Sequence, residues 1–372
     1  MKISAFARVA AIGAVATLAL AGCAANEPNE PAPTSSESTS AEPTTPALAG
    51  TIRATGASSQ ANAQEAWQAG FQTAHTGVTV NYEPTGSGTG RTNFQTGASE
   101  FIGSDRAFKV DEIAGGFEMC VTPEIVEVPL YISPVAVAFN LDGIETLNLD
   151  SETIAKIFAG QITNWNDPAI AAHNSGVSLP DQAISPVHRS DKSGTQGTFT
   201  AYLVSAAPEV WTWESADEWP TDLAGEGAQG TSGVKAALSG GAGTIGFLDA
   251  SQADGLGQIH IEVAGGYVAY SAEAASALVE NSPLEEGRSA GDLVFAVDPA
   301  AAPAGAYPIA LVSYLVACEQ YADENVGNLV REYFLYMASE EGQAAAAANA
   351  GNAPISAGLR EKAVAAINLI QG

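Results

Sequence analysis

The sequence predicts an α/β fold with mainly parallel sheets. From Thr51 onward, short runs rich in β-branched residues alternate with segments of helical periodicity, which is the pattern of sheets covered by helices. The first pair is a strand at 51–54 followed by a helix, because apolar residues recur at positions i, i+3, i+4 and i+8, namely Ala63, Ala66, Trp67 and Phe71.

The same order of strand, small-residue turn and helix occurs twice more. A strand at 78–82 leads through the turn 86–90 to a helix beginning at about Arg91 and then to a strand at 101–102. A later strand at 184–187 leads through the turn 193–195 to a helix. The buried stripe of that helix is Phe199, Tyr202 and Leu203.

These turns have a chemical meaning because the first turn of a helix carries unpartnered N–H groups and the positive end of the helix dipole. Such a terminus attracts anions. A Ser or Thr at one of them is usually only a helix cap, but three together indicate an anion site. The segment Gly241–Gly246 matches G-x-G-x-x-G. It lies between a helix and a strand, so we interpret it as a tight connection and not as a dinucleotide site.

The first 22 residues have the features of a secretory signal peptide, with Lys2 and Arg8 before an apolar run that is too short to span a membrane. The run ends in Leu-Ala-Gly-Cys, which resembles a bacterial lipobox and predicts acylation of Cys23; an incidental cysteine is the alternative. Residues 23–50 are rich in Pro, Ser, Thr and Glu and are expected to be a disordered, lipid-anchored linker. The acyl group on Cys23 would be the only attachment of the chain to the membrane.

The charge balance argues against nucleic-acid binding, because 14 basic residues face 42 acidic ones and the net charge is −28. At the same time, 46% hydrophobic residues are enough for a sizeable core. The four histidines are scattered and no Cys or His cluster has metal-ligand spacing. We therefore expect no metal and no cofactor.

Two cysteines remain in the exported part of the chain, Cys120 and Cys318. In an oxidising compartment an isolated pair forms a disulfide more often than it stays reduced. We expect a disulfide, with two free thiols as the alternative.

Three segments together resemble one family. Residues 188–203 (HRSDKSGTQGTFTAYL) are similar to an Arg-x-Asp-x-Ser-Gly-Thr block entering a helix, residues 86–90 (GSGTG) to a Gly-Ser-rich loop, and residues 101–105 (FIGSD) to a Gly-Ala-Ser-Asp stretch. The family is that of bacterial phosphate-binding lipoproteins, the substrate-binding subunits of phosphate-specific ABC importers. The resemblance spans nearly all of residues 51–372.

The resemblance implies that one phosphate is surrounded by hydroxyl groups, helix-start N–H groups, one guanidinium and one carboxylate. Asp191 would hold the guanidinium of Arg189, whose alternative role is a surface salt bridge. Lys192 stands where a glycine is frequent, and Ser58 where a threonine is frequent. The implied phosphate-binding residues are Ser58, Ser59, Ser87, Asp105, Arg189, Ser193, Gly194 and Thr195.

Asp105 would determine specificity. A carboxylate beside an anion is unfavourable unless the ligand donates a proton to it, which hydrogen phosphate can do and sulfate cannot. Specificity then arises from rejection of the wrong ligand. The alternative role of Asp105 is to cap a neighbouring helix or turn.

The resemblance also implies a two-lobed periplasmic-binding-protein fold, type II-like, in which hinge strands join two α/β lobes around the ligand. We expect crossings near 133–138 and 304–311. These give lobe I as residues 51–135 plus 308–372, and lobe II as residues 136–307. The implied protein is a monomer on the outer face of the cytoplasmic membrane that delivers phosphate to the permease subunits of an ABC importer.

Two other classes of protein are alternatives. An exported phosphatase or serine hydrolase would use Ser87 or Ser193 as its nucleophile, but the sequence has no G-x-S-x-G, P-loop or H-E-x-x-H motif. We therefore expect no enzyme activity. A binding protein for another tetrahedral oxyanion, sulfate or molybdate, is disfavoured by Asp105, because those ions bring no proton.

Overall fold

The computed structural model describes residues 47–372, which form one compact unit. The predicted signal peptide, Cys23 and the linker up to residue 46 lie outside the described residues. The first strand begins at Ala49, two residues before the expected start of the folded part. Among residues 47–372, no helix is both long enough and apolar enough to cross a bilayer.

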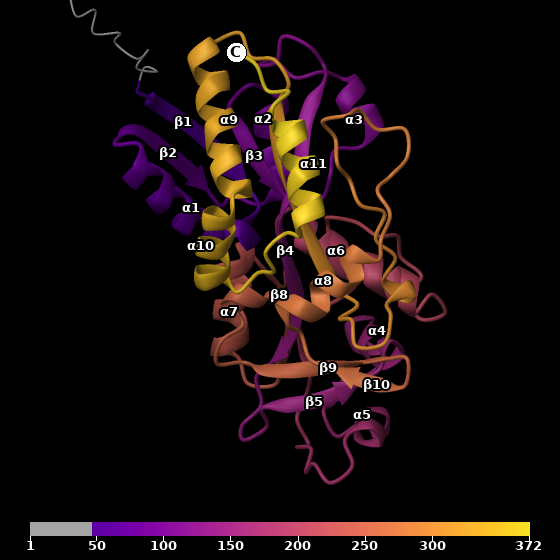
Figure 1. The fold of residues 1–372 in the computed structure, drawn as a ribbon. Helices are drawn as coiled ribbons and strands as arrows, with labels where there is room; N and C mark the ends of the chain where they lie inside the picture. Colours follow the sequence, from indigo (N-terminus) through magenta and orange to yellow (C-terminus); the bar gives the residue numbers. More distant parts are fainter. Residues whose placement is uncertain (1–46) are drawn as a thin grey trace, which may run out of the picture. The chain divides into compact units, whose positions relative to one another are not determined.

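Eleven strands form one sheet, ordered β2-β1-β3-β11-β4-β8-β6-β7, with β9 also paired to β4 and carrying β5 and β10 (Figure 1). The α/β class is confirmed, but the expectation of mainly parallel pairing is wrong. β11 runs antiparallel to β3 and β4, and β4 runs antiparallel to β8 and β9. The strands are β1 (Ala49–Gly56), β2 (Gly77–Glu83), β3 (Phe101–Ser104), β4 (Ile125–Phe139), β5 (Thr146–Leu149), β6 (Ser185–Arg189), β7 (Glu226–Ala228), β8 (Thr244–Asp249), β9 (Gly257–Val263), β10 (Gly266–Val268) and β11 (Ala310–Cys318).

The long strand β4 connects the two halves of this sheet. Its residues 125–134 pair with β11, and its residues 135–139 pair with β8. All fifteen of its residues are buried. The mixed pairing follows from this arrangement, because β11 brings the chain back alongside β4 in the opposite direction. The predicted two-lobed α/β fold is confirmed.

Helices cover both halves of the sheet (Figure 1). Most begin at a Ser or Asp whose side chain accepts a backbone N–H, as Asp150, Asp323 and Ser356 do. The helices are α1 (Ala61–Ala74), α2 (Ser87–Gln95), α3 (Val110–Ala114), α4 (Ser151–Phe158), α5 (Pro168–His173), α6 (Gly194–Ala206), α7 (Gly230–Gly240), α8 (Ala272–Glu280), α9 (Glu324–Ala338), α10 (Glu340–Ala350) and α11 (Ala357–Ile367), with short 3-10 turns η1 (Ser58–Gln60), η2 (Ala250–Gln252) and η3 (Pro299–Ala301).

One helix boundary differs from the sequence prediction. Helix α2 begins at Ser87 and not at Arg91, so the Gly-Ser-rich segment is the first helical turn itself. Gly86 precedes it with a φ of 99°, a conformation that favours glycine. The segment Gly241–Gly246 does connect a helix to a strand, α7 to β8, as expected.

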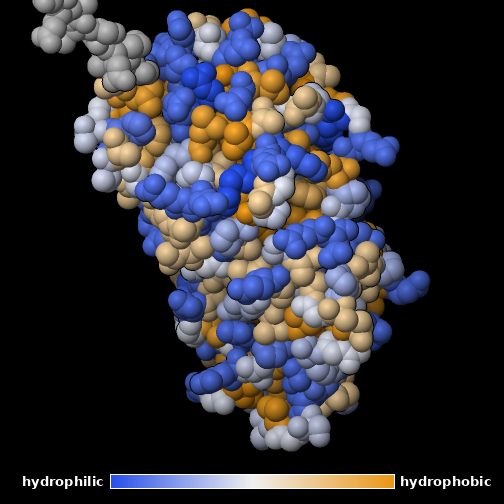
Figure 2. Space-filling model, in the orientation of Figure 1, coloured by the Kyte–Doolittle hydropathy of each residue, from blue (hydrophilic) through white to orange (hydrophobic). Residues whose placement is uncertain are grey.

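The core fills the space between the sheet and its helices. In the first half, Phe101 of β3 packs edge-on against Phe334 of α9, with ring centroids 5.5 Å apart. A disulfide joins Cys120 to Cys318 at the end of β11. Figure 2 shows hydrophilic side chains over much of one face of the molecule, with apolar atoms in scattered patches.

Candidate functional site

The starts of four helical segments meet between the two halves of the sheet. The backbone N–H of Gly88 in α2 donates to the carbonyl of Lys192, just before α6, at 3.0 Å. The N–H of Thr231 in α7 donates to Ser58 Oγ in η1 at 3.1 Å. The sequence predicted small-residue turns before helices at 56–59, 86–90 and 193–195, although the helix after the second turn was expected to begin at about Arg91. The starts of helical segments from both halves therefore come together at one place, as a shared anion site requires.

The start of α7 was missed in the sequence analysis. Thr231 lies within the small-residue segment 229–233 (QGTSG), which follows β7 and opens α7. Its Oγ1 lies 3.0 Å from Ser58 Oγ. This is the same order of strand, small-residue turn and helix as at the other three starts, and it was the signal that could have found Thr231.

Asp105 lies just after β3 and is the centre of the site. Its side chain accepts hydrogen bonds from three hydroxyl groups, and only 6% of the residue is exposed. Ser59 and Ser313 each donate to Oδ1 at 2.6 Å, and Thr195 donates to Oδ2 at 2.7 Å. Its own backbone N–H donates to Ser87 Oγ at 3.1 Å. The carboxylate is therefore held by groups from both halves of the sheet.

Ser313 was also missed by the sequence analysis. It lies in the middle of β11, within the run ALVSYLVAC, and is fully buried. A single serine in an apolar strand carries no motif, so its position beside Asp105 becomes apparent only when β11 pairs with its neighbours.

Arg189 ends β6 and is 3% exposed. Its Nε and Nη2 groups donate to the two carboxylate oxygens of Asp191 at 2.8 and 2.5 Å, as a bidentate pair. Burial raises the pKa of Asp191, but the Arg189 guanidinium and the N–H of Gly230 more than offset this, so the pKa is below its ordinary value. Asp191 thus stays ionised and fixes the orientation of Arg189.

Residues 193–195 form the start of α6. Ser193 Oγ accepts the N–H of Gln196 at 3.3 Å, so its hydroxyl hydrogen can be donated elsewhere. Gly194 lies against the backbone of Asp105, where an added Cβ would be 2.6 Å from the Asp105 Cβ. A larger residue at 194 would force α6 away from Asp105.

Glycines also allow α2 to approach the Arg189 loop. An added Cβ on Gly86 would lie 3.5 Å from Arg189 Nη2 and would collide with Asp191. An added Cβ on Gly88 would collide with the side chain of Lys192. The exposed Lys192 side chain itself lies 3.7 Å from Glu218, and its backbone, not its amine, contacts α2.

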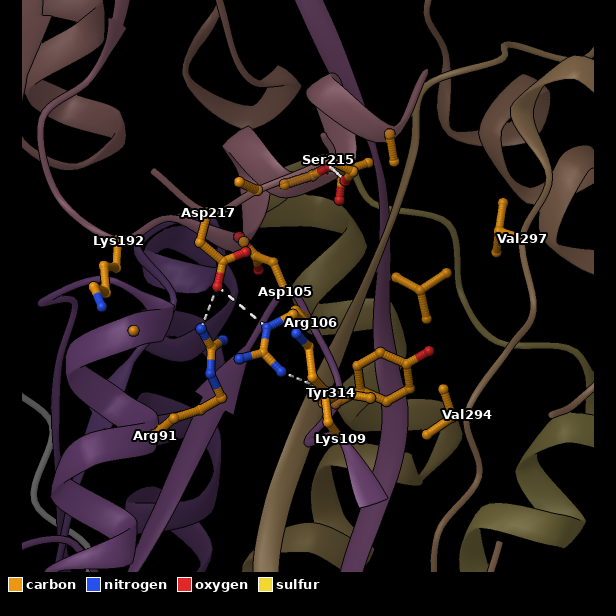
Figure 3. Close-up of a pocket in the computed structure, with 18 of the residues that line it drawn as sticks. Arg91, Asp105, Arg106, Lys109, Lys192, Ser215, Asp217, Val294, Val297 and Tyr314 are labelled. Carbon is orange, nitrogen blue, oxygen red and sulfur yellow. Dashed lines mark hydrogen bonds and ion pairs between the residues drawn. The ribbon is translucent and has the colours of Figure 1, made fainter. Parts of the chain in front are cut away.

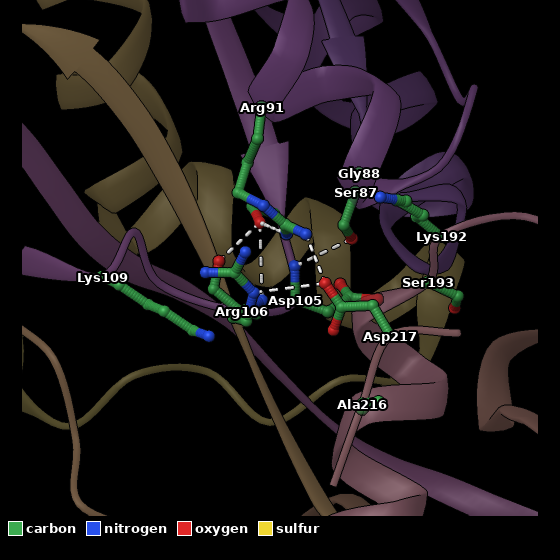
Figure 4. Close-up of polar contacts among 12 residues, drawn as sticks. Ser87, Gly88, Arg91, Asp105, Arg106, Lys109, Lys192, Ser193, Ala216 and Asp217 are labelled. Atoms are coloured by element: carbon green, nitrogen blue, oxygen red, sulfur yellow. Dashed lines mark hydrogen bonds and ion pairs between the residues drawn. The ribbon is translucent and has the colours of Figure 1, made fainter. Parts of the chain in front are cut away.

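A pocket of about 780 Å³ opens beside Asp105 (Figure 3). At its inner end Arg91 of α2 and Arg106 both contact Asp217 of the segment between α6 and β7 (Figure 4). Arg106 also pairs with Glu112, whose pKa is about 2 because these hydrogen bonds and those of Lys109 outweigh the effect of burial. This network joins the two halves of the sheet at the edge of the site.

All eight sequence-predicted binding residues lie around this site. The side chains of Ser59 and Thr195 are hydrogen-bonded to the Asp105 carboxylate, and Ser87 Oγ accepts the backbone N–H of Asp105. Ser58 instead bonds Thr231. Within residues 47–372 no group of three or more His, Cys, Asp or Glu side chains is arranged to hold a metal ion.

A two-lobed fold with helix starts, hydroxyl groups and one guanidinium gathered between its halves defines the class of solute-binding proteins. A family model described as a PBP superfamily domain matches residues 41–341. The phosphate-binding protein PstS 3 of Mycobacterium tuberculosis is 34% identical over 326 residues, which cover 86% of each chain. PstS of Xylella fastidiosa is 30% identical over 72% of each chain.

The chain therefore belongs to the PBP superfamily and, within it, to the family of phosphate-binding proteins PstS. Among solved structures, a high-affinity periplasmic phosphate-binding protein, PfluDING, bound with phosphate has a TM-score of 0.69 at 21% identity, covering 85% of this chain and 93% of that one. A phosphate ABC transporter substrate-binding protein of Clostridium perfringens with bound phosphate has a TM-score of 0.59. These structures share the fold.

Proposed function

We propose that this protein captures hydrogen phosphate between its two lobes and delivers it to an ABC importer. The observation that carries this proposal is the set of hydrogen bonds at Asp105, whose side-chain oxygens accept from three hydroxyl groups. An anion can approach such a carboxylate favourably only if it brings its own proton. Hydrogen phosphate does so, and relatives of this chain are named phosphate-binding proteins.

The remaining groups supply the attraction. The ligand would receive hydrogen bonds from the hydroxyl groups of Ser58, Ser87 and Ser193, from the backbone N–H groups of Ser59, Gly194 and Thr195, and from the Arg189 guanidinium that Asp191 orients. Surface charges are screened over about 8 Å at physiological salt. A buried site therefore responds mainly to its own dipoles and to Arg189, although the whole chain carries a net charge of −28.

The lobe boundaries are part of this proposal. We assign residues 51–135 and 308–372 to lobe I and residues 136–307 to lobe II. The change of β4 from β11 to β8 as its partner at residue 135 supports the first boundary. Hydrogen bonds between the lobes, such as Thr195 to Asp105 and Thr231 to Ser58, would then form only when the lobes close.

We further propose that the protein is exported, acylated at Cys23 and held at the outer face of the cytoplasmic membrane as a monomer. The sequence features of residues 1–50 support this location. The permease subunits of an ABC importer would be its partners.

The other functions are less well supported. Sulfate and molybdate lack the proton that Asp105 requires, which disfavours a binding protein for either. A phosphatase would need a base beside its nucleophile, Ser87 or Ser193. Among residues 47–372, Ser87 Oγ accepts the backbone N–H of Asp105 and Ser193 Oγ accepts that of Gln196, and neither hydroxyl is hydrogen-bonded to a histidine. We propose that the protein has no catalytic activity.

The test is calorimetric titration of the mature chain carrying Cys23→Ser, which prevents acylation, with phosphate and with sulfate. We expect saturable binding of phosphate and no displacement of phosphate by an equal concentration of sulfate. Equal competition by the two anions would contradict the proposal. Release of phosphate from a chromogenic ester would instead indicate an enzyme.

A further inference from the structure

A chain of four buried hydrogen bonds ends at Asp105. The Tyr333 hydroxyl donates to Gln64 Oε1 at 2.9 Å, and Gln64 Nε2 donates to Gln60 Oε1 at 3.1 Å. Gln60 Nε2 donates to Ser313 Oγ at 2.7 Å, and the Ser313 hydroxyl donates to Asp105 Oδ1 at 2.6 Å. The four residues before Asp105 are completely buried, so water does not interrupt the chain.

The direction of these hydrogen bonds is fixed by their surroundings. Gln60 Nε2 also lies 3.3 Å from the carbonyl oxygen of Tyr314, which can only accept, so the amide nitrogen must be on this side. Ser313 therefore accepts from Gln60 and has its hydrogen free for Asp105. At the far end, burial raises the pKa of Tyr333 well above its ordinary value, so its hydroxyl keeps its proton.

The consequence concerns the acceptor positions of Asp105. Ser59, Ser313 and Thr195 all donate to it, and a carboxylate accepts at about four lone-pair positions. Three of these positions are therefore filled by hydroxyl groups of the protein. This leaves one acceptor position on the carboxylate, which can accept a hydrogen bond from a ligand that carries a proton.

We propose that Tyr333, Gln64, Gln60 and Ser313 are positioning residues that keep Asp105 an obligate hydrogen-bond acceptor, and so determine that the ligand must be protonated. This inference rests on the proposed function and deepens it. Without these donors, the Asp105 carboxylate is no longer held in one orientation, and its free acceptor position no longer points toward the proton of the ligand. The preference for hydrogen phosphate over sulfate is then weakened.

The experiment measures the ratio of the sulfate and phosphate dissociation constants in mildly alkaline buffer, where both anions carry nearly the same charge. Ser313→Ala removes a hydrogen bond to a charged group and should reduce this ratio roughly 10- to 100-fold. Gln60→Leu leaves the Ser313 hydroxyl in place but removes the amide group that donates a hydrogen bond to it. We therefore expect a smaller reduction of the ratio. Ser313→Thr keeps the hydroxyl and should retain the wild-type ratio.

Ser99→Ala is the matched control. Ser99 is also fully buried in the first half of the sheet, and its hydroxyl lies 2.9 Å from Thr55 Oγ1 and not beside Asp105. It should lower thermal stability without changing the ratio. Thermal unfolding of every variant reports on folding, and Gln60→Leu provides the test if Ser313→Ala does not fold.

The experiment distinguishes failure of this inference from failure of the proposed function. If Ser313→Ala and Gln60→Leu weaken phosphate and sulfate by the same factor, the ratio stays at its wild-type value and this inference is overturned. If the wild-type protein itself does not bind phosphate, the proposed function fails instead.

Discussion

Thr195 Oγ1 donates a hydrogen bond to Asp105 Oδ2 at 2.7 Å, across 90 positions of sequence. It joins the first turn of α6 to the end of β3. The Thr195 hydroxyl thus holds the carboxylate that would select the ligand, while the Thr195 N–H would bind it. Both groups are buried, so their interaction is little screened by solvent.

Thr195→Val should weaken phosphate binding roughly 10- to 100-fold, because it removes a charge-assisted hydrogen bond while keeping the shape of the side chain. Isothermal titration measures the change. Thr198→Val, one turn further along α6 at the pocket wall, is the control and should bind phosphate as the wild type does. Wild-type affinity in Thr195→Val would show that the hydrogen bond from Thr195 to Asp105 does not support phosphate binding.

Asp217→Asn should make phosphate leave faster. Asp217 pairs with both Arg91 and Arg106. Arg106 also pairs with Glu112, but Arg91 is buried, so the loss of the Asp217 charge leaves the Arg91 guanidinium without its ion-pair partner. We expect the dissociation rate to rise roughly tenfold, measured by stopped-flow displacement. Glu218→Gln changes the neighbouring exposed carboxylate and should leave the rate unchanged. An unchanged rate in Asp217→Asn would exclude a role for this ion pair in retaining the ligand.

Asp249 should make stability fall as the pH rises. Burial raises its pKa to about 6, although hydrogen bonds from Ser251 and Tyr131 oppose this. The unfolded-state value is about 4, so the folded protein binds the extra proton between about pH 4 and 6. The favourable contribution is complete below this window and is lost as the pH rises through it. Between about pH 4 and 7 the loss is about 3 kcal/mol relative to Asp249→Asn.

Urea unfolding of the wild type and of Asp249→Asn at a series of pH values measures this difference. Asp142→Asn replaces an exposed carboxylate in the turn after β4 and serves as the control. A constant difference in unfolding free energy between wild type and Asp249→Asn across this pH range would be inconsistent with a raised pKa.

Reduction of the Cys120–Cys318 disulfide should destabilise the fold substantially. The bond spans 198 positions, and closing so long a loop restricts the unfolded chain by roughly 5 kcal/mol. Thermal unfolding of the Cys23→Ser protein with and without reductant measures the effect, because Cys120 and Cys318 are then its remaining cysteines. The double variant Cys120→Ser/Cys318→Ser should lose as much stability and no longer respond to reductant. A melting temperature that reductant does not change would contradict this prediction.

Local patterns in the sequence were sufficient to predict much of the fold and of the site. The strand and helix pairs around residues 56–59, 86–90 and 193–195 were predictable because strand, turn and helix signals follow one another within about thirty residues. Mixed pairing was not predictable, since it depends on β11 returning beside β4 from far along the chain. Pairing of distant strands has no local signature.

The residues that were missed have the same explanation. Ser313 lies in an apolar strand, and only the register of β11 against β3, which pairs Tyr314 with Ser104, brings it to Asp105. Gln60 and Gln64 are four residues apart in η1 and α1 and belong to no motif. They are buried and bonded to each other. A series of buried, hydrogen-bonded side chains cannot be recognised from sequence before the partners are known.

The most direct test of the central claim is the competition between phosphate and sulfate in the wild type and in Asp105→Asn. An asparagine in this place offers an N–H group as a donor, so the account predicts weaker phosphate binding and a sulfate affinity that rises toward that of phosphate. If Asp105→Asn discriminates between the two anions as strongly as the wild type does, Asp105 does not select the ligand by its proton and the account is wrong.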